Sequence, residues 1–279
     1  MERPNLKYDG VTHLTYPDEL KKTVLLAASA WESFCALSLQ TKNIFTSSNT
    51  FNGVGYEMKI GTTESKDQKE NFDFTAAGAS ELLTKAIENQ DNNNSAVNFI
   101  NSATQLVDQA TPVIKQFGHT IETEFGISGF EDLAVRSAPN AFFRFLHYPS
   151  NDLSTGSIIA EPHSDHSGFT LHLLESTDGC ERLSFDKKRW EPLPVAKDQA
   201  VAFNGMQTQY LANEAYALSH RVIANETTRK FGRFAIVCFV PLKGIPTHNR
   251  TKNGRLQDKA PGFNYGMPSQ EFAKLFKEI

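Results

Sequence analysis

The stretch EPHSDHSGFTLHLL, residues 161 to 174, places His163 and Asp165 two positions apart in a segment of strand-forming residues. Residues two apart on an extended strand project from the same face, so both side chains can reach one ion. An imidazole and a carboxylate are common metal ligands. The stretch therefore predicts a strand that carries two ligands of a metal site.

The second half of the chain, from about residue 139, has the sequence pattern of β strands. Its apolar segments are short, rich in β-branched and aromatic residues, and separated by turn-forming clusters. The segments are NAFFRFLHYP (140 to 149), SGFTLHLLES (167 to 176), QAVAFNGM (199 to 206), SHRVIANET (219 to 227) and GRFAIVCFVPL (232 to 242). This half is predicted to form a β barrel or sandwich.

The first part of the chain is predicted to be mainly helical. Residues 19 to 37 space their apolar side chains by mostly three and four, as a core-facing helix does. These side chains are Leu20, Val24, Leu25, Ala28, Trp31 and Phe34. Two polar stretches, 61 to 70 and 89 to 95, indicate loops, and a second helical stretch runs to about Phe125 with a break or kink at Pro112. Helices followed by strands give an α+β plan with the helices on one face of the β unit.

A third candidate ligand, His220, lies 55 residues after Asp165 (220 minus 165), in another predicted strand. Two imidazoles and one carboxylate form the facial triad of non-heme Fe(II) oxygenases, which leaves open positions for oxygen and substrate. A His-x-Asp pair alone is weak evidence, but here all three residues fall among ordered strands. We therefore predict an iron centre formed by His163, Asp165 and His220.

Arg233 opens the strand GRFAIVCFVPL, and it shares one face with Ala235, Val237 and Phe239. A buried guanidinium needs an anion, and it is suited to bidentate binding of a carboxylate. Arg233 is thus a candidate anchor for an anionic co-substrate. Two alternatives stay open: Arg233 lies at an exposed strand start and pairs with a surface Asp or Glu, or Arg229 has the functional role.

Composition excludes several classes of function. A formal net charge of −4 and the lack of a basic run argue against nucleic-acid binding, and no stretch is long enough to cross a bilayer. The start of the chain, MERPNLKYDG, has no apolar segment of a secretory signal, so we expect a cytoplasmic protein. Cys35, Cys180 and Cys238 lack CxxC spacing and are expected to be reduced thiols.

Taken in order, these motifs resemble the isopenicillin N synthase-like branch of the 2-oxoglutarate and Fe(II) dioxygenases over roughly residues 51 to 245. The resemblance includes the Tyr-Pro that ends 142 to 149, the His-x-Asp and later Thr of 163 to 170, and the Gly and Trp of 179 to 195. It extends to 204 to 213 and 219 to 225. Upstream, NGVGYEM (52 to 58) and DQKENFDF (67 to 74) resemble the Gly-Tyr and Lys-Glu segments of that family.

The resemblance implies a double-stranded β-helix, the jelly-roll or cupin-like fold, within a single catalytic domain over 1–279. The parts would be a mainly helical 1–138, a β-helix core at 139–245 and a C-terminal segment at 246–279. It also implies that Fe(II) is held by His163, Asp165 and His220. Arg233 would anchor the distal carboxylate of 2-oxoglutarate, with Tyr148 as its neighbour. Two residues depart from the family pattern, since Ala235 replaces a serine and Leu146 stands where many relatives have Asn.

The resemblance further implies the oxidation of an unactivated C–H bond of a small metabolite, such as an amino-acid derivative, with O2. Hydroxylation, desaturation and ring closure all remain open, and neither the substrate nor the oligomeric state can be read. His172, Phe203 and Tyr210 are candidate substrate contacts, although each is also a plausible core residue. The alternatives are an oxidase resembling isopenicillin N synthase, which needs no 2-oxoglutarate, and a metal-binding barrel without catalysis. A demethylase of nucleic acid or protein is disfavoured by the charge balance.

Overall fold

The computed structural model describes residues 4–46, 54–59, 68–89, 93–184, 189–212 and 214–245, so the expected C-terminal segment, 246–279, lies outside the described residues. The helices are α1 (Leu6–Asp9), α2 (Asp18–Cys35), α3 (Leu39–Asn43), α4 (Ala79–Glu88), α5 (Ser95–Gln109), α6 (Thr111–Phe125), α7 (Phe130–Ser137), α8 (Met206–Leu211) and α9 (Glu226–Phe231), with 3-10 turns η1 (Ala76–Gly78) and η2 (Ala138–Asn140). The strands are β1 (Thr12–Thr15), β2 (Gly55–Lys59), β3 (Lys69–Thr75), β4 (Phe142–Tyr148), β5 (Ile158–His163), β6 (Phe169–Glu175), β7 (Cys180–Leu183), β8 (Trp190–Pro192), β9 (Gln199–Asn204), β10 (His220–Ile223) and β11 (Arg233–Val240). In the described part of the chain, no helix is both long and apolar enough to cross a membrane.

Two antiparallel sheets form the β unit. Within the described residues, a seven-stranded sheet has the order β1-β9-β6-β11-β4-β3-β2, and a four-stranded sheet has the order β5-β10-β7-β8. From β4 onward the chain passes back and forth between the two sheets, with β4, β6, β9 and β11 in the larger one and β5, β7, β8 and β10 in the smaller one. This winding is that of a jelly roll, so the predicted α+β fold with a double-stranded β-helix core is confirmed.

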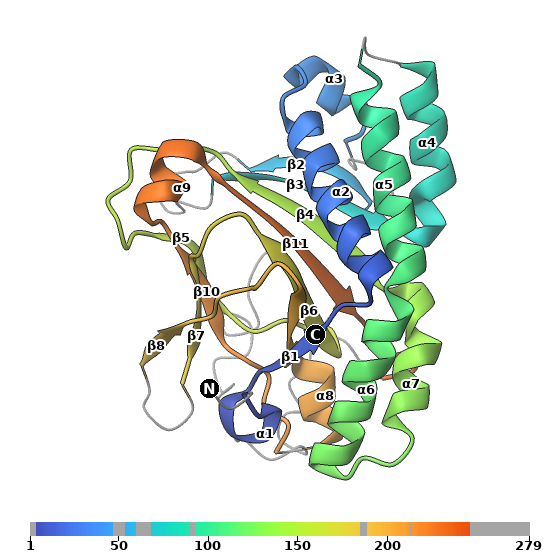
Figure 1. Ribbon diagram of the computed structural model, residues 1–279, viewed down its shortest axis with the longest axis vertical. Helices are drawn as coiled ribbons and strands as arrows, with labels where there is room; N and C mark the ends of the chain where they lie inside the picture. Colours follow the sequence, from blue (N-terminus) through green and yellow to red (C-terminus); the bar gives the residue numbers. More distant parts are fainter. Residues whose placement is uncertain are drawn as a thin grey trace, which may run out of the picture.

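The helices cover one side of the seven-stranded sheet. Figure 1 shows α2, α4, α5, α6 and α7 together beyond that sheet, with the four-stranded sheet on the opposite side. The layer of contact is aromatic. The Phe99 ring of α5 lies 5.2 Å from the Trp31 ring of α2 in a tilted arrangement, and 4.9 Å from the Phe145 ring of β4 in an edge-to-face arrangement, measured between ring centroids. Packing of this kind gives many of the 21 phenylalanines a place in the core.

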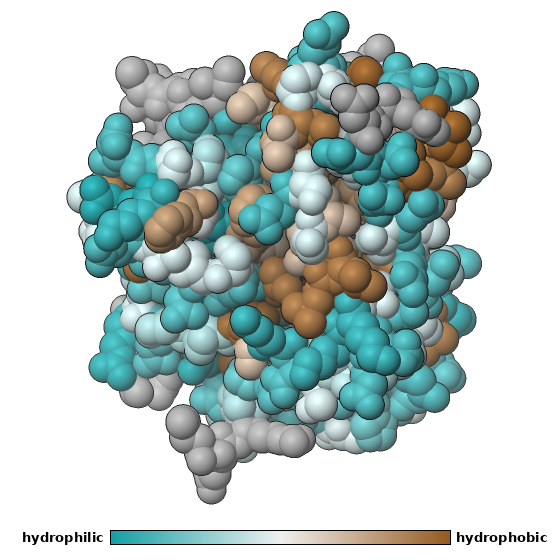
Figure 2. Space-filling view, turned by 45° about the horizontal axis from the view of Figure 1, so that its top comes forward, coloured by the Kyte–Doolittle hydropathy of each residue, from teal (hydrophilic) through white to brown (hydrophobic). Residues whose placement is uncertain are grey.

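The sequence predicted a helix break at Pro112 and a buried Leu25 in the helical half. The predicted break at Pro112 is confirmed, because α5 ends at Gln109 and Pro112 lies in the first turn of α6, where a missing N–H costs no hydrogen bond. The placement of Leu25 in the core was wrong. Leu25 is 41% exposed, whereas Ala27 is fully buried. Apolar residues also reach the surface elsewhere, and Figure 2 shows them in patches among hydrophilic ones.

The polar stretch 61 to 70 is not a loop to its end, because Lys69 and Glu70 are the first residues of β3. In the antiparallel register Glu70 lies opposite His147 of β4. Residues of a strand alternate between the faces of its sheet. Glu70 and His147 face the helices, while Lys69 and Tyr148 line the cavity on the other face. The sequence pattern hid this strand because it begins with charged residues.

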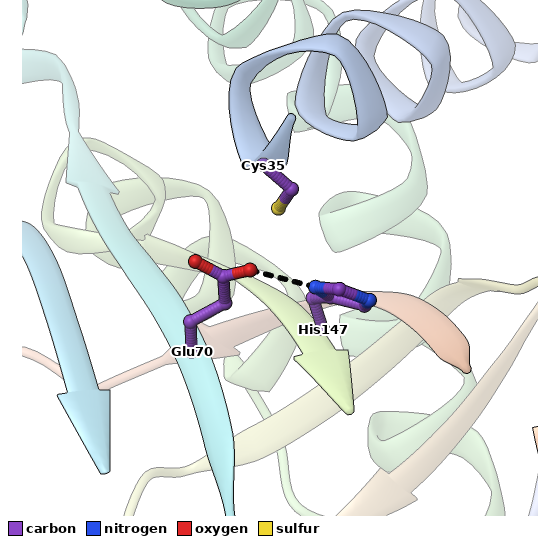
Figure 3. A group of neighbouring side chains, drawn as sticks. All are labelled: Cys35, Glu70 and His147. Atoms are coloured by element: carbon purple, nitrogen blue, oxygen red, sulfur yellow. Dashed lines mark hydrogen bonds and ion pairs between the residues drawn. The ribbon is translucent and has the colours of Figure 1, made fainter. Parts of the chain in front are cut away.

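Glu70 of β3 is a buried carboxylate that links its own strand to β4, α3 and β2. Its Oε1 bonds His147 Nδ1, and its Oε2 accepts hydrogen bonds from Lys42 of α3 and Tyr56 of β2, all at 2.7 Å. Figure 3 shows the Glu70 and His147 pair beneath the Cys35 side chain at the end of α2. Cys35, Glu70 and His147 are residue types that bind metals. However, the Lys42 ammonium already compensates the carboxylate, and burial raises the pKa of the Cys35 thiol, so the cluster is better explained as a structural junction.

Acid is expected to weaken this junction. Although burial opposes it, hydrogen bonds from His147, Lys42 and Tyr56 lower the pKa of Glu70 to about 2. A carboxyl with a depressed folded-state pKa stabilises the fold above its unfolded pKa of about 4.5, and that stability, about 3 kcal/mol here, is lost as the pH falls towards 2. Urea unfolding should therefore show a large loss for Glu70→Gln at pH 7, and a smaller difference from the parent protein at pH 3.

A matched control is Glu81→Gln on α4, whose side chain is 60% exposed and pairs with Lys85. Exposed pairs one helical turn apart contribute at most about 0.5 kcal/mol, so this variant should unfold like the parent at both pH values. An equal loss for Glu70→Gln at pH 3 and pH 7 would contradict the assignment of the acid-sensitive group.

Candidate metal centre

His163 and His220 are brought together by the pairing of two strands. His163 ends β5, His220 begins β10, and they stand opposite each other in antiparallel register. Asp165 lies two residues beyond β5, in the connection to β6, and not on the strand as the sequence pattern predicted. Its Oδ1 is 3.7 Å from Nε2 of His163 and 4.0 Å from Nε2 of His220. A donor atom from each residue lies within 4.8 Å of the other two, so one ion can be reached by all three.

Neighbouring groups orient the three side chains. Nδ1 of His163 is 2.7 Å from the Glu161 carbonyl oxygen, and Nδ1 of His220 is 3.3 Å from that of Leu218. These contacts place the proton on Nδ1 and leave Nε2 as the donor atom for a metal, the usual arrangement for metal-binding histidines. Thr170 donates a hydrogen bond of 2.5 Å to Oδ2 of Asp165, which leaves Oδ1 facing the two imidazoles.

The charge states also suit a divalent cation. Burial, reinforced by His220, holds the pKa of His163 well below its ordinary value, so the imidazole is neutral at pH 7. Although burial opposes it, the two imidazoles lower the pKa of Asp165, which keeps the carboxylate ionised. Two imidazole nitrogens and one carboxylate oxygen fit Fe(II) and leave coordination positions open.

The triad lines a cavity between the two sheets. The walls include Arg233, Ala235, Val237 and Phe239 of β11, the four residues that the alternation of this strand placed on one face. Tyr148 lies opposite Arg233 in the register of β4 and β11 and also lines the cavity. The structure thus brings the candidate metal ligands and both candidate co-substrate contacts to one place.

Arg233 is buried, with 1% of its surface exposed, so it does not lie at an exposed strand start. Its carboxylate partner is Glu175 of β6: Nη2 donates to Oε2 at 2.6 Å, and both side chains are almost fully buried. Nε donates to the Thr177 carbonyl at 3.2 Å. The anion that the sequence pattern required is therefore present within the protein itself. The guanidinium still has N–H groups beyond these two bonds, and Arg233 lines the cavity.

The remaining candidates fall in different places. His172 and Phe203 line the cavity, and the Phe203 ring is 5.0 Å from that of His220. Tyr210 lies on α8, and Arg229 lies on α9. Neither is among the described residues that line the cavity.

Sequence reasoning missed three polar groups of the cavity region. Glu175, a charged residue at the end of the buried strand β6, was visible as an anomaly, but its partner was not. Arg144 lines the cavity and forms a two-bond pair with Asp73 at 2.6 and 2.7 Å. Lys69 lines the cavity from β3, with Nζ 5.7 Å from the centroid of the Tyr148 ring.

Comparison with known proteins gives one family. Residues 139–241 match the family model of the 2OG-Fe(II) oxygenase superfamily. No curated protein sequence matches the chain. The matched range holds β4 to β11, and so it contains all three candidate ligands and Arg233.

Solved structures share the fold at low sequence identity. A 2OG-Fe(II) oxygenase family protein of Caulobacter crescentus matches with a TM-score of 0.68 and 19% identity, over 85% of this chain and 79% of that one. A full-length protein of Neurospora crassa, solved in complex with alpha-KG, matches with a TM-score of 0.67 and 17% identity, over 98% and 88%. The rice dioxygenase for auxin oxidation matches with a TM-score of 0.61 and 18% identity, over 84% and 74%.

Proposed function

We propose that this chain, as a member of the 2OG-Fe(II) oxygenase superfamily, catalyses the O2-dependent oxidation of an unactivated C–H bond in a small molecule. The membership rests on the match of residues 139–241 to the family model. Fe(II) and 2-oxoglutarate are the cofactor and co-substrate of this family. The observation that carries the proposal is the cluster of His163, Asp165 and His220 on the cavity between the two sheets. The substrate that we propose is derived from an amino acid.

Three groups of residues in the cavity have separate tasks in this proposal. His163, Asp165 and His220 hold Fe(II), which supplies the oxygen chemistry when it is bound. The remaining N–H groups of Arg233, together with Tyr148, bind the distal carboxylate of 2-oxoglutarate. Val237, Phe239 and Phe203 exclude water from the reacting groups.

His172 supports a substrate that can donate a hydrogen bond. Its Nε2 is buried and has no hydrogen-bond partner among the described residues, while the ring bonds the backbone of Leu174. Burial lowers the pKa of His172, so the ring is neutral. Since the bond to Leu174 favours the protonated ring, it runs from Nδ1–H to a carbonyl, and Nε2 is an acceptor. The N–H of an amino-acid derivative, or a hydroxyl, would satisfy it.

If His172 is kept for a ligand, removing it should stabilise the ligand-free protein. A buried polar atom without a partner costs about 1–3 kcal/mol, so His172→Leu should raise the free energy of unfolding by about 1 kcal/mol in the absence of ligands. His172→Ala removes the same atom but leaves a void, and it should be destabilising. Thermal unfolding of both variants tests this, and a less stable His172→Leu would mean that Nε2 serves the fold.

The test of the reaction is anaerobic addition of Fe(II) and then 2-oxoglutarate. A visible charge-transfer band should form, and succinate should be released once oxygen is admitted. Amino acids and short peptides would then be screened for faster succinate release. Without the band and without succinate the co-substrate assignment fails. Oxygen consumption without succinate would instead identify an oxidase that needs no 2-oxoglutarate.

A further inference from the structure

Arg144 of β4 presents hydrogen-bond donors to the cavity. Its Nε and Nη2 donate to the two carboxylate oxygens of Asp73, at 2.6 and 2.7 Å. A guanidinium has about five N–H groups in all, so those of Nη1 and the second one of Nη2 remain. Among the described residues the guanidinium makes no hydrogen bond other than the two to Asp73, and Arg144 lines the cavity. The remaining N–H groups are therefore available to a ligand there.

The guanidinium is held in place before any ligand binds. Asp73 occupies the edge formed by Nε and Nη2. Cζ of Arg144 lies 5.7 Å from the ring centroid of Phe142 and 5.7 Å from that of Phe239, and these two rings stack on each other at 4.7 Å. A side chain that is already ordered costs less conformational entropy when a ligand binds to it.

His172 faces the same part of the cavity. Arg144 on β4 and His172 on β6 both lie opposite Val237 of β11 in antiparallel register. Residues opposite each other in neighbouring strands point to the same face, and all three line the cavity. Two strand spacings, about 10 Å, separate the backbones of Arg144 and His172. A group above Val237 can thus meet the Arg144 donors on one side and Nε2 of His172, a buried acceptor without a partner among the described residues, on the other.

We propose that Arg144 and His172 together select a substrate with a neutral amide group, in which Arg144 donates to the carbonyl oxygen and Nε2 of His172 accepts from the N–H. This inference rests on the proposed function and names its substrate class: lactams, imides, carboxamides or peptide bonds. A neutral acceptor suits Arg144 better than a carboxylate does. Asp73 already balances the guanidinium, so a substrate carboxylate would add a poorly compensated negative charge beside Asp73.

An amide at this place would lie close to the candidate metal centre. Thr170 and His172 are two residues apart on β6, so both side chains point into the cavity, which both line. Thr170 donates the hydrogen bond that orients Asp165. The residue that reads the N–H is therefore about 7 Å along the strand from the residue that orients a metal ligand. C–H bonds next to the amide are the ones presented to the metal.

The experiment compares three probes built on six-membered rings. 2-Piperidone has a carbonyl beside an N–H, cyclohexanone has only the carbonyl, and cyclohexanecarboxylate is an anion. Their dissociation constants are measured anaerobically by calorimetry on the protein with Fe(II) and 2-oxoglutarate. The parent should bind 2-piperidone about 10-fold more tightly than cyclohexanone, because only the lactam satisfies Nε2 of His172, and should bind the carboxylate most weakly. His172→Leu should bind 2-piperidone and cyclohexanone equally.

Arg144 is tested together with its partner. Arg144→Met combined with Asp73→Asn removes both charges, so no buried carboxylate is left unpaired. This double variant should bind 2-piperidone and cyclohexanone about 10-fold more weakly than the parent does. The matched control is Arg221→Met with Glu181→Gln, an ion pair whose side chains are 21% and 15% exposed, compared with 18% and 10% for Arg144 and Asp73. Neither Arg221 nor Glu181 is among the described residues of the cavity wall, so the control should bind like the parent.

The inference is overturned if the parent binds 2-piperidone no better than cyclohexanecarboxylate, or if the Arg144 and Asp73 double variant binds the two carbonyl probes as the parent does. Equal weakening of all three probes would also overturn it, because that result indicates a distorted cavity. A parent that prefers 2-piperidone but forms neither the charge-transfer band nor succinate would instead refute the proposed function and leave the amide site in place.

Discussion

Asp165→Asn is expected to lose Fe(II) affinity by more than about 100-fold, the upper end of what removing a partner outside the coordination sphere costs. The amide keeps the shape of the carboxylate and can still accept the hydrogen bond from Thr170. It lacks the negative charge that offsets a divalent cation between two neutral imidazoles. Anaerobic Fe(II) titration measures the loss, and oxygen consumption should disappear with it.

Thr170→Val provides the graded comparison. It removes only the hydroxyl that directs Oδ2 of Asp165 away from the metal site, so Fe(II) affinity should fall by about 10–100-fold while the three ligands remain. Circular dichroism should show both variants folded. If Asp165→Asn bound Fe(II) as tightly as the parent, the assignment of the three ligands would be wrong, and unchanged oxygen consumption would favour a site elsewhere.

The β half of the molecule was predictable because its signals are local. Segments such as 167 to 176 and 232 to 242 are short, rich in β-branched or aromatic residues and separated by turn-forming clusters, and all five predicted strands are present as β4, β6, β9, β10 and β11. His163 and Asp165 were identifiable because they are two residues apart. Their use as metal ligands with His220 remains a proposal.

The parts that sequence reasoning missed depend on partners far away in the chain. Glu70 bonds His147 across 77 residues, and Arg233 bonds Glu175 across 58 residues. The local pattern of Lys69 and Glu70 is that of a polar loop, and only pairing with β4 makes it a strand. Leu25 was assigned to the core because its spacing to Ala28 is helical, but the buried face of α2 runs through Val24 and Ala27, and the next residue after Val24 lies about 100° further round the helix.

The pair of Arg233 and Glu175 leads to the second large expected effect. Glu175→Gln leaves the buried guanidinium without its counter-charge, and removing one partner of a buried ion pair costs about 3–5 kcal/mol. Because Arg233 stays charged at every accessible pH, the loss relative to the parent protein should be similar at pH 7 and pH 8. Urea unfolding of the metal-free protein measures it.

Arg233→Met should behave differently, because its orphaned partner can be neutralised by a proton. Burial already raises the pKa of Glu175, and without Arg233 that pKa rises further. A carboxyl with a raised folded-state pKa favours the fold fully below its unfolded pKa, about 4.5, and loses that contribution as the pH rises through the folded value. The variant should therefore be close to the parent near pH 4.5 and clearly weaker at pH 8. The acid effect at Glu70 is common to both proteins and cancels in the comparison.

Ligand binding then separates the structural task of the pair from its task in the cavity. In Glu175→Gln the distal carboxylate of 2-oxoglutarate becomes a counter-charge for Arg233, so 2-oxoglutarate with Fe(II) should raise the melting temperature of this variant more than that of the parent. 2-Oxopentanoate, which lacks the distal carboxylate, should give no such difference. In Arg233→Met the stabilisation by 2-oxoglutarate should instead shrink. If both variants responded to 2-oxoglutarate as the parent does, the guanidinium would serve only the fold, because a group that contacts the distal carboxylate must change its binding when its own charge is freed or removed.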